Sequence, residues 1–299
     1  MSDRSGDYDH WAALYNRTVG PDYCREQVRF LDWALLPSVP TGGRLLDLCC
    51  GTGQLIAPLL ARGYAVTGLD YSADMLRFAA ENAPGAEFVQ GDARDFTFER
   101  RFDGVFCTSA SLNHMMSLDD LGRVFASVRR CLVDGGVFVF DVNHPAQLLR
   151  YWRGQPAEGE IHPDFAWLIT PRYDAASREG AFTVDIYRQP PGSEGGGWKG
   201  LVGRVLGHPR LMRSRLRLLG RFDRFRPDWE RRSTDYPIRG HDLEAVESLL
   251  RTCGFAPDLR TVDGKSEVDE RHAAHFVCRA IPVPSPTMSD HREPAEAAS

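Results

Sequence analysis

The sequence predicts an α/β fold in which a doubly wound, mostly parallel sheet of seven strands carries a mostly antiparallel β cap after its fifth strand. Between residues 44 and 143, runs with the pattern of strands alternate with runs that have the apolar spacing of helices. Such alternation is typical of a parallel sheet with helices on both faces. The alternation stops after Asn143, and residues 152–239 are dense in Arg, Pro and Gly with several β-like runs. This change in pattern predicts a separate unit inserted into the sheet.

The first strand and its turn carry the clearest local signal. Residues 44–50 form a short apolar run, and Gly51 and Gly53 follow it. Glycine allows a tight backbone turn, and the helix after such a turn presents its free amide groups to a ligand. Further strands are expected at 65–69, 87–90 and 102–107, and helices near 54–62, 73–82 (with Ser72 as N-cap) and 118–132.

An acid closes each of the next two predicted strands. Asp70 ends the second strand, where a carboxylate can accept both hydroxyl protons of a ribose. Asp92 ends the third, close enough to hydrogen-bond an adenine amino group. Together with the glycine turn, these strand ends indicate one ligand pocket.

These motifs, in this order, resemble those of the class I S-adenosylmethionine-dependent methyltransferases. The family has a glycine-rich turn after strand one, acids ending strands two and three, and a fourth strand similar to residues 102–107. Residues 132–140, with Gly135 and Gly136, match the family's turn into strand five. The resemblance covers residues 45–143 firmly and 241–280 weakly. It implies a Rossmann-like fold, S-adenosyl-L-methionine as cofactor and methyltransferase activity.

The resemblance places the cofactor at these strand ends. The turn 70–72 and Met75 correspond to the family's segment beneath the adenine and ribose, although a methionine here is more often a core residue. Cys49 departs from the family, which most often has a glycine at this position. The expected cofactor-binding residues are Tyr15, Asp47, Cys49, Gly51, Gly53, Asp70, Tyr71, Met75, Asp92, Ala93 and Ser109.

Two other interpretations of the glycine turn fit the sequence less well. A nicotinamide or flavin site needs Gly-x-Gly-x-x-Gly, but the third glycine position is Ile56 here. An ordinary turn after a buried strand would account for Gly51 and Gly53 alone, but not for four motifs in order.

Length and composition fit a cytoplasmic enzyme. The 299 residues suffice for one enlarged domain or two small ones with a substantial core. The net charge of −5 argues against general nucleic-acid binding. Seven cysteines without a Cys-x-x-Cys pair favour reduced thiols. No apolar run approaches the ~20 residues of a spanning helix, and the scattered histidines and acids of the cap disfavour a metal site.

The pattern along the chain suggests four parts. We expect a helical N-terminal lid at 1–40, a methyltransferase core at 41–151 and 240–281, a substrate-binding cap at 152–239 and a disordered tail at 282–299. In the resembling family such a preface often folds over the cofactor, which makes Tyr8 and Tyr15 lid candidates; simple packing on the core is an equal alternative. Strands of the cap are expected at 165–170, 181–189, 215–222 and 231–236, with a flexible turn at 190–197.

The preface and the cap are expected to choose the methyl acceptor, most simply a small molecule enclosed between two units. The site must hold the acceptor in line with the methyl group and remove a proton where the acceptor carries one. His114, after strand four, is the candidate base, although a lone histidine is more often structural. The candidate substrate contacts are Asn113, Asn143, His144, Tyr187, Tyr236 and His241.

Two further functions remain open from sequence. The cap carries a basic run from Arg204 to Arg232 that could dock RNA, although a solvated basic face is the preferred interpretation. The chain could also bind the cofactor without transferring its methyl group. The sequence does not distinguish oxygen, nitrogen or carbon acceptors and leaves the oligomeric state open.

Overall fold

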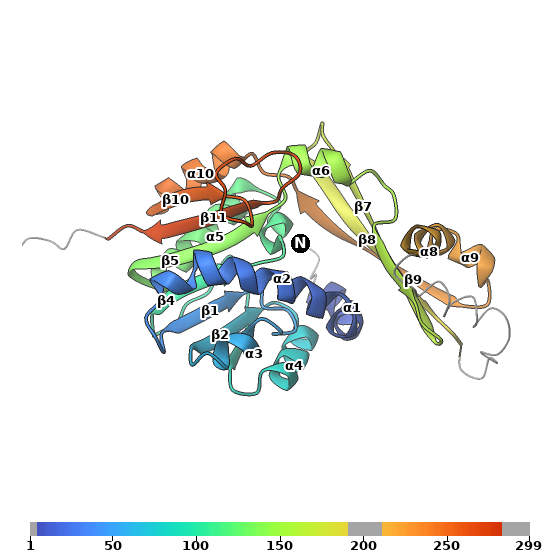
Figure 1. Ribbon diagram of the computed structural model, residues 1–299, viewed down its shortest axis with the longest axis horizontal. Helices are drawn as coiled ribbons and strands as arrows, with labels where there is room; N and C mark the ends of the chain where they lie inside the picture. Colours follow the sequence, from blue (N-terminus) through green and yellow to red (C-terminus); the bar gives the residue numbers. More distant parts are fainter. Residues whose placement is uncertain (1–4, 191–210, 283–299) are drawn as a thin grey trace, which may run out of the picture.

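A computed structural model describes residues 5–190 and 211–282, which form two sheets (Figure 1). The larger has seven strands in the order β10-β11-β5-β4-β1-β2-β3, and the smaller has four in the order β6-β7-β8-β9. The predicted α/β fold with an antiparallel cap inserted after the fifth strand is confirmed.

The larger sheet is parallel from β5 to β3, and β11 joins it antiparallel to both β5 and β10. Its strands are β1 (Arg44–Leu48), β2 (Ala65–Asp70), β3 (Glu87–Gln90), β4 (Phe102–Cys107), β5 (Leu132–Val142), β10 (Phe255–Arg260) and β11 (Ala274–Ala280). The helices around it are α2 (Val19–Ala34), α3 (Ile56–Leu60), α4 (Ala73–Asn82), α5 (Leu118–Cys131) and α10 (Leu243–Thr252).

Helices cover both faces of this sheet, so its central strands are apolar on both sides. On β5, Phe138 and Phe140 pack with α5 and α10, whereas Val137 and Val139 pack with α2 and α3. The sheet core therefore lies in two layers, and only the strand ends reach a surface.

α5 shows how the sequence specifies these elements. Ser117 caps its N-terminus by accepting a hydrogen bond from the Asp120 backbone amide at 3.0 Å. Two acids in the first turn and two arginines in the last complement the helix dipole. Its buried side chains recur every three or four residues: Leu121, Val124, Phe125, Ser127, Val128 and Cys131.

The cap follows α6 (Pro145–Tyr151). Its strands are β6 (Glu158–Ile161), β7 (Phe165–Asp174), β8 (Glu179–Arg188) and β9 (Glu230–Arg239). The inner face of this sheet packs against α1 (Ser5–Arg17) and Met75 of α4 (Figure 1). Two short helices, α8 (Met212–Leu219) and α9 (Phe222–Phe225), cover part of the outer face, away from the core.

One predicted strand of the cap is wrong. Residues 215–222 were expected to be extended, because arginine and leucine alternate there, but they fall in α8, the turn after it and the start of α9. Leu216, Leu219 and Phe222 pack together against the outer face of the cap sheet. Their spacing of three residues is helical, and this packing outweighs the local alternation.

The remaining boundaries lie close to the predictions. α10 begins after Asp242, whose carboxylate accepts from the Glu244 amide at 3.1 Å, so His241 precedes the helix. The short helices η1 (Leu36–Ser38) and η2 (Ser111–His114) follow α2 and β4. The predicted turn at 191–197 and tail at 283–299 lie outside the described residues. No helix in the described ranges is both long and apolar enough to cross a membrane.

Candidate functional site

The turn after β1 has an unusual backbone. Cys49, Gly51 and Gly53 have φ values of 61°, 53° and 68°, in the left-handed region that favours glycine. A Cβ on Gly53 would lie 2.8 Å from the Cβ of Ala79, so this glycine allows the turn to touch α4. A Cβ on Gly51 would meet no atom closer than a Tyr15 ring carbon at 3.9 Å. The backbone at Gly51 therefore borders open space, as a ligand-binding turn requires.

Asp70 joins this turn to the next one. Its Oδ2 accepts from the Gly51 amide at 2.8 Å, and its Oδ1 accepts from the Ser72 amide at 2.9 Å. A carboxylate has about four lone-pair positions, so these bonds are compatible with the predicted ribose contact.

A small cavity lies between the turn after β1 and the end of β4. Its volume is about 40 Å³, close to the share of one water molecule. Tyr15 of α1 and Cys24 of α2 close it on the N-terminal side. The lining residues are Tyr15, Cys24, Asp47, Cys49, Cys50, Gly51, Leu55, Thr108, Ser109 and Ser111.

Buried acids lie at this edge of the sheet. Burial and the neighbouring Asp70 raise the pKa of Asp47 well above its usual value. Burial also raises the pKa of Asp141, at the end of β5, to about 7, although backbone amides of Ala110 and Ser109 donate to it. Burial, followed by Cys24 and these acids, raises the pKa of the Tyr15 phenol. A positively charged ligand bound beside these carboxyl groups would lower their pKa values.

The predicted adenine side is less tightly arranged. Asp92 follows β3 and is held by its neighbour Arg94, with the closest contact at 2.6 Å. Burial would raise the pKa of Asp92, but the hydrogen bonds from Arg94 outweigh it, and the pKa is lowered. Tyr71 is 46% exposed, Ala93 is buried in the sheet core, and Met75 is buried beneath the cap. Their contact with a cofactor stays a prediction.

His114 lies where the core meets the cap. It ends η2, and its Nδ1 donates to the Pro237 carbonyl of β9 at 2.8 Å. This bond fixes the tautomer, so that the Nε2 of the neutral ring carries the lone pair. Phe182 of β8 faces the ring edge-on at 5.8 Å and stacks on Tyr236 at 5.0 Å. Trp152 extends this aromatic wall, with its ring 6.3 Å from Phe182.

Asn113 has a structural role here. Its side-chain amide donates to the carbonyls of Asn143 and Arg239 at 2.8 and 2.7 Å, and its oxygen accepts from the Asn143 amide at 2.8 Å. The side chain is only 1% exposed. Asn113 thus links the ends of β5 and β9. Its side-chain nitrogen and oxygen, which we expected to contact substrate, are hydrogen-bonded to the backbone instead. Asn143 itself is half-buried beside this tie.

Three other predicted substrate contacts lie elsewhere. The buried His144 donates from Nε2 to the carbonyls of Asp269 and His272, so it anchors a C-terminal loop. His241 donates to the Met115 carbonyl at 2.7 Å, and burial lowers its pKa. Tyr187 points to the outer face of the cap and packs on Phe222. Successive residues of a strand face opposite sides, and Tyr187 has the outward position.

The same alternation shows which residues sequence reasoning missed. Phe182, Val184 and Ile186 are apolar at every second position of β8, and all three contact the inner cluster. This alternation indicates Phe182 as an inward-facing residue of the cap, whereas the hydroxyl of Tyr187 suggested a substrate contact that its outward position does not allow. Cys24 of α2 and Asp141 of β5 also reach the edge, but no local motif marks them.

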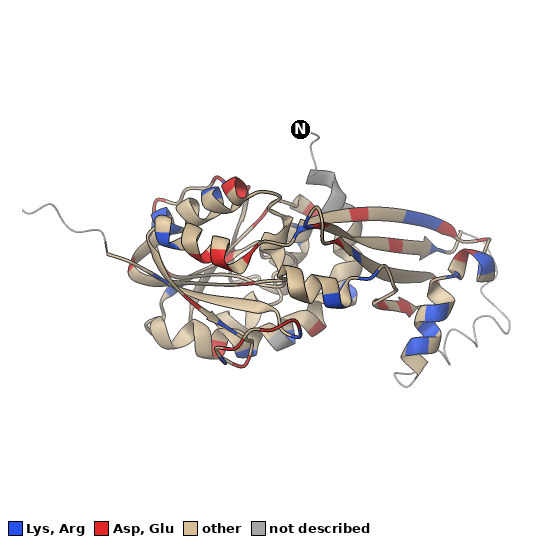
Figure 2. Cartoon of the chain, turned by 90° about the horizontal axis from the view of Figure 1, so that it is seen from above, with Lys and Arg blue, Asp and Glu red and all other residues tan. Residues whose placement is uncertain are grey.

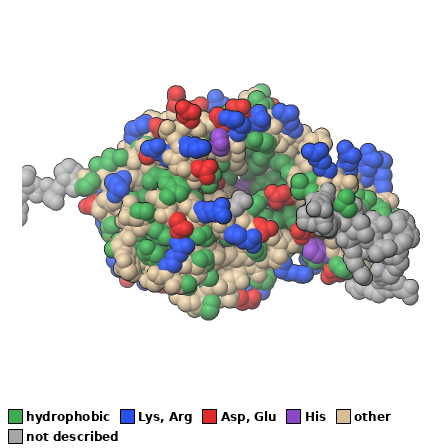
Figure 3. Space-filling view, viewed as in Figure 1, with side chains coloured by type: hydrophobic (Ala, Val, Ile, Leu, Met, Phe, Trp, Pro, Cys, Tyr) green, Lys and Arg blue, Asp and Glu red, His purple; other side chains and the backbone are tan. Residues whose placement is uncertain are grey.

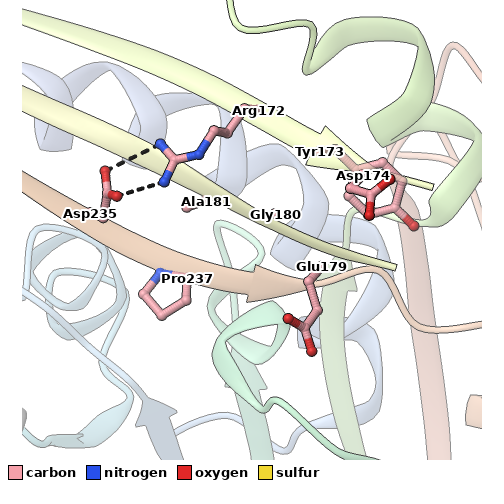
Figure 4. A pocket seen from close by; sticks show the side chains of 8 residues that line it. All are labelled: Arg172, Tyr173, Asp174, Glu179, Gly180, Ala181, Asp235 and Pro237. Carbon is pink, nitrogen blue, oxygen red and sulfur yellow. Dashed lines mark hydrogen bonds and ion pairs between the residues drawn. The ribbon is translucent and has the colours of Figure 1, made fainter. Parts of the chain in front are cut away.

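Figure 3 views the side shown in Figure 1, where hydrophobic side chains gather between core and cap beside acidic and basic ones. A larger hollow of about 600 Å³ lies on the outer part of the cap. There Arg172 reaches from β7 across β8 to Asp235 of β9, with one bond at 3.2 Å and one at 2.5 Å (Figure 4). This hollow holds none of the predicted site residues, although its lining residue Pro237 accepts the hydrogen bond from His114.

Known proteins match the core in sequence and the whole chain in fold. The model of a family described as "Methyltransferase domain" matches residues 45–136. "Putative methyltransferase YqeM" of Bacillus subtilis is 40% identical over 46% of this chain and 55% of its own length. "Uncharacterized methyltransferase sll0829" of Synechocystis is 40% identical over 49% of this chain and 70% of its own.

Two further matches are a methyltransferase named for an amino-sugar substrate and a crystal structure. "dTDP-3-amino-3,6-dideoxy-alpha-D-glucopyranose N,N-dimethyltransferase" of Streptomyces fradiae is 33% identical over 47% of this chain and 55% of its own. A crystal structure of an S-adenosylmethionine-dependent methyltransferase from Clostridium acetobutylicum superposes with a TM-score of 0.65, at 16% identity, over 92% of this chain and 99% of that one. The chain spans about half the length of several curated relatives.

The matched residues 45–136 contain the predicted cofactor motifs. They are the glycine turn after β1, Asp70 at the end of β2 and Asp92 after β3. The family assignment rests on the 40% identity to the Synechocystis methyltransferase over 70% of its length. The chain therefore belongs to the class I S-adenosylmethionine-dependent methyltransferases.

Proposed function

We propose that this protein transfers the methyl group of S-adenosylmethionine to a small molecule bound between the sheet edge and the inner face of the cap. The observation that carries the proposal is the position of η2. This short helix begins four residues after β4, next to the turn predicted to hold the cofactor, and ends on His114 against β9 of the cap. A substrate at His114 would lie between the two units.

The cofactor, when bound, supplies an electrophilic methyl group. The chain's own residues would bind the cofactor and accept the proton of the methyl acceptor. Gly51 and Asp70 would hold the ribose side of the cofactor, and the buried carboxylate of Asp47 would face its positively charged part. His114 would accept a proton from the acceptor at Nε2, because Nδ1 is already committed to Pro237.

The cap favours a small acceptor with an apolar body. Phe182, Tyr236 and Trp152 present aromatic surface beside His114. Relatives named for their substrates act on a nucleotide-linked amino sugar, a naphthoquinone and a fatty acid, all of them small molecules.

The arginines of α8 give RNA methylation little support. α8 packs on the outer face of the cap, and Figure 2 shows the positions of its basic residues along this helix. An RNA bound by this part of the described chain would lie on the wrong face of the cap sheet to present a base at η2.

The test has two steps. Titration calorimetry with S-adenosylmethionine measures whether the reduced protein binds the cofactor. Incubation with methyl-labelled cofactor and a set of amines, phenols and carboxylic acids then measures transfer. Label in a product from wild type, with a large loss in His114→Gln at unchanged cofactor affinity, is the expected result. Cofactor binding without transfer to any acceptor class would favour a protein that only binds the cofactor.

A further inference from the structure

Cys49 and Cys107 lie in contact at the floor of the candidate cofactor site. Cys107 is the last residue of β4, and Cys49 is the first residue after the neighbouring parallel strand β1. The register of these strands ends at the pair of Asp47 and Phe106, so both cysteines lie just beyond it. Adjacent strands are about 4.8 Å apart. A disulfide accepts Cα separations of about 4.4 to 6.8 Å.

Both side chains pack in one hydrophobic cluster, in which Cys107 is a buried member and Cys49 lies against it. The neighbouring Cys49 thiol, followed by burial, raises the pKa of Cys107. All seven cysteines are free thiols in the structure. Because Cys49 lies in the turn and Cys107 in β4, the pair can form a covalent bond by a movement of the turn, with no rearrangement of the sheet.

The two thiols differ in access. Cys49 is half-buried and lines the cavity, so a small oxidant that enters the cofactor site meets it first. Cys107 is fully buried behind it. Cys49 is therefore the thiol that an oxidant modifies first, and Cys107 is the thiol that can then react with the oxidised sulfur.

We propose that Cys49 and Cys107 form an oxidative modification site, in which a disulfide closes the S-adenosylmethionine pocket. Hydrogen peroxide oxidises the Cys49 thiol to a sulfenic acid and is itself reduced to water. The Cys107 sulfur then attacks the Cys49 sulfur, the S–S bond forms, and the hydroxyl leaves with the Cys107 proton as a second water.

The bond would alter the turn that faces the ligand. Cys49 already has a left-handed backbone at φ 61°, and two residues later the Gly51 amide donates to Asp70 at 2.8 Å. Cys107 is fixed in the central strand β4, so Cys49 must move toward it when the sulfurs bond. That movement pulls the turn away from Asp70 and changes the cavity wall. The effect on affinity rests on the proposed cofactor site, whereas formation of the bond does not.

Peptide mapping tests the bond itself. The reduced full-length protein is treated with hydrogen peroxide, blocked with N-ethylmaleimide and digested with trypsin. Cleavage at flanking arginines gives one peptide of residues 45–62 and one of 102–123, which remain joined only if a disulfide links them. Fragmentation then distinguishes Cys49 from its neighbour Cys50. We expect the Cys49 to Cys107 link, and its loss on adding dithiothreitol.

Calorimetry on the same samples tests the consequence. Oxidised wild type should bind S-adenosylmethionine about tenfold more weakly or worse, and dithiothreitol should restore the affinity. Cys107→Ser should give no joined peptide and should lose less affinity than wild type after peroxide, because Cys49 is then oxidised without being pulled toward β4. Cys131→Ser is the matched control, because this buried thiol donates to the Val128 carbonyl in α5, and it should respond like wild type.

Several results would overturn the proposal. They are the absence of a joined peptide in wild type, a link from Cys49 to Cys24 or Cys50 instead, or a linked protein that binds the cofactor as tightly as the reduced one. If Cys107→Ser does not fold, the peptide map of the wild-type protein still shows whether the disulfide forms. If the reduced protein binds no cofactor, the proposed function fails, while the peptide map still reports on the bond.

Discussion

Replacing Asp141 with asparagine should remove a large part of the pH dependence of folding stability. Asp141 is buried at the end of β5, where its Oδ2 accepts from the Ala110 amide at 2.9 Å and its Oδ1 has no hydrogen-bond partner within the described chain. Burial raises its pKa from 3.8 to about 7. The folded protein therefore holds this proton over a range in which the unfolded chain has released it. Stability must fall as the pH rises through that range.

The magnitude follows from the two pKa values. Each tenfold difference in proton affinity corresponds to about 1.4 kcal/mol, so the charged form costs roughly 4 kcal/mol above the folded pKa. Roughly 2 to 3 kcal/mol of this cost develops between pH 5 and pH 8. Asparagine does not titrate, so Asp141→Asn should lose less stability over this interval by about that amount.

Urea unfolding of both proteins at the two pH values measures the difference. Asp164→Asn is the control, because this acid is exposed in the loop before β7 and its loss changes the net charge equally. Equal pH dependence in wild type and Asp141→Asn would refute the assignment of a raised pKa to this group. A change in Asp164→Asn as large as in Asp141→Asn would point to net charge instead.

Three further changes test other parts of the site. Asp70→Ala should weaken S-adenosylmethionine binding by roughly 1 to 3 kcal/mol in calorimetry, because a half-buried carboxylate that orders the first turn is lost; wild-type affinity would contradict its role. Asn113→Ala removes three hydrogen bonds between strand ends and should lower the free energy of unfolding by roughly 2 to 4 kcal/mol in urea, whereas a change below 1 kcal/mol would mean that water replaces them. Gly53→Ala places a Cβ 2.8 Å from Ala79 at a φ of 68° and should lower the melting temperature, more than Gly63→Ala, whose added Cβ meets nothing within 4 Å; equal effects would assign the cost to backbone strain alone.

Much of the core could be predicted because its signals are local. The strand at 102–107 and the helix at 73–82 match β4 and α4, since a short apolar run and a capped amphipathic segment have few alternatives. The cap was harder. Residues 215–222 alternate like a strand, yet form α8 and α9 because Leu219 and Phe222 find partners on the outer face of a sheet that is distant in sequence.

Site residues divide in the same way. Asp70 and Gly51 could be chosen from the motif, because the order of strand ends fixes which side chains reach the edge. The sequence could not show which histidines have a structural role and which face a ligand. His114, His144 and His241 each donate to a backbone carbonyl contributed by another part of the chain.

By itself, the sequence determined the alternating core, the glycine turn and the acids that mark the methyl donor, because hydrophobic periodicity and turn chemistry act over a few residues. Only the tertiary structure decided what surrounds that donor site. It placed the inner face of the cap beside His114, turned Tyr187 outward, made Asn113 a tie between strands and brought Cys49 against Cys107. These contacts join residues tens of positions apart, and the packing of the whole chain alone determines which of them meet.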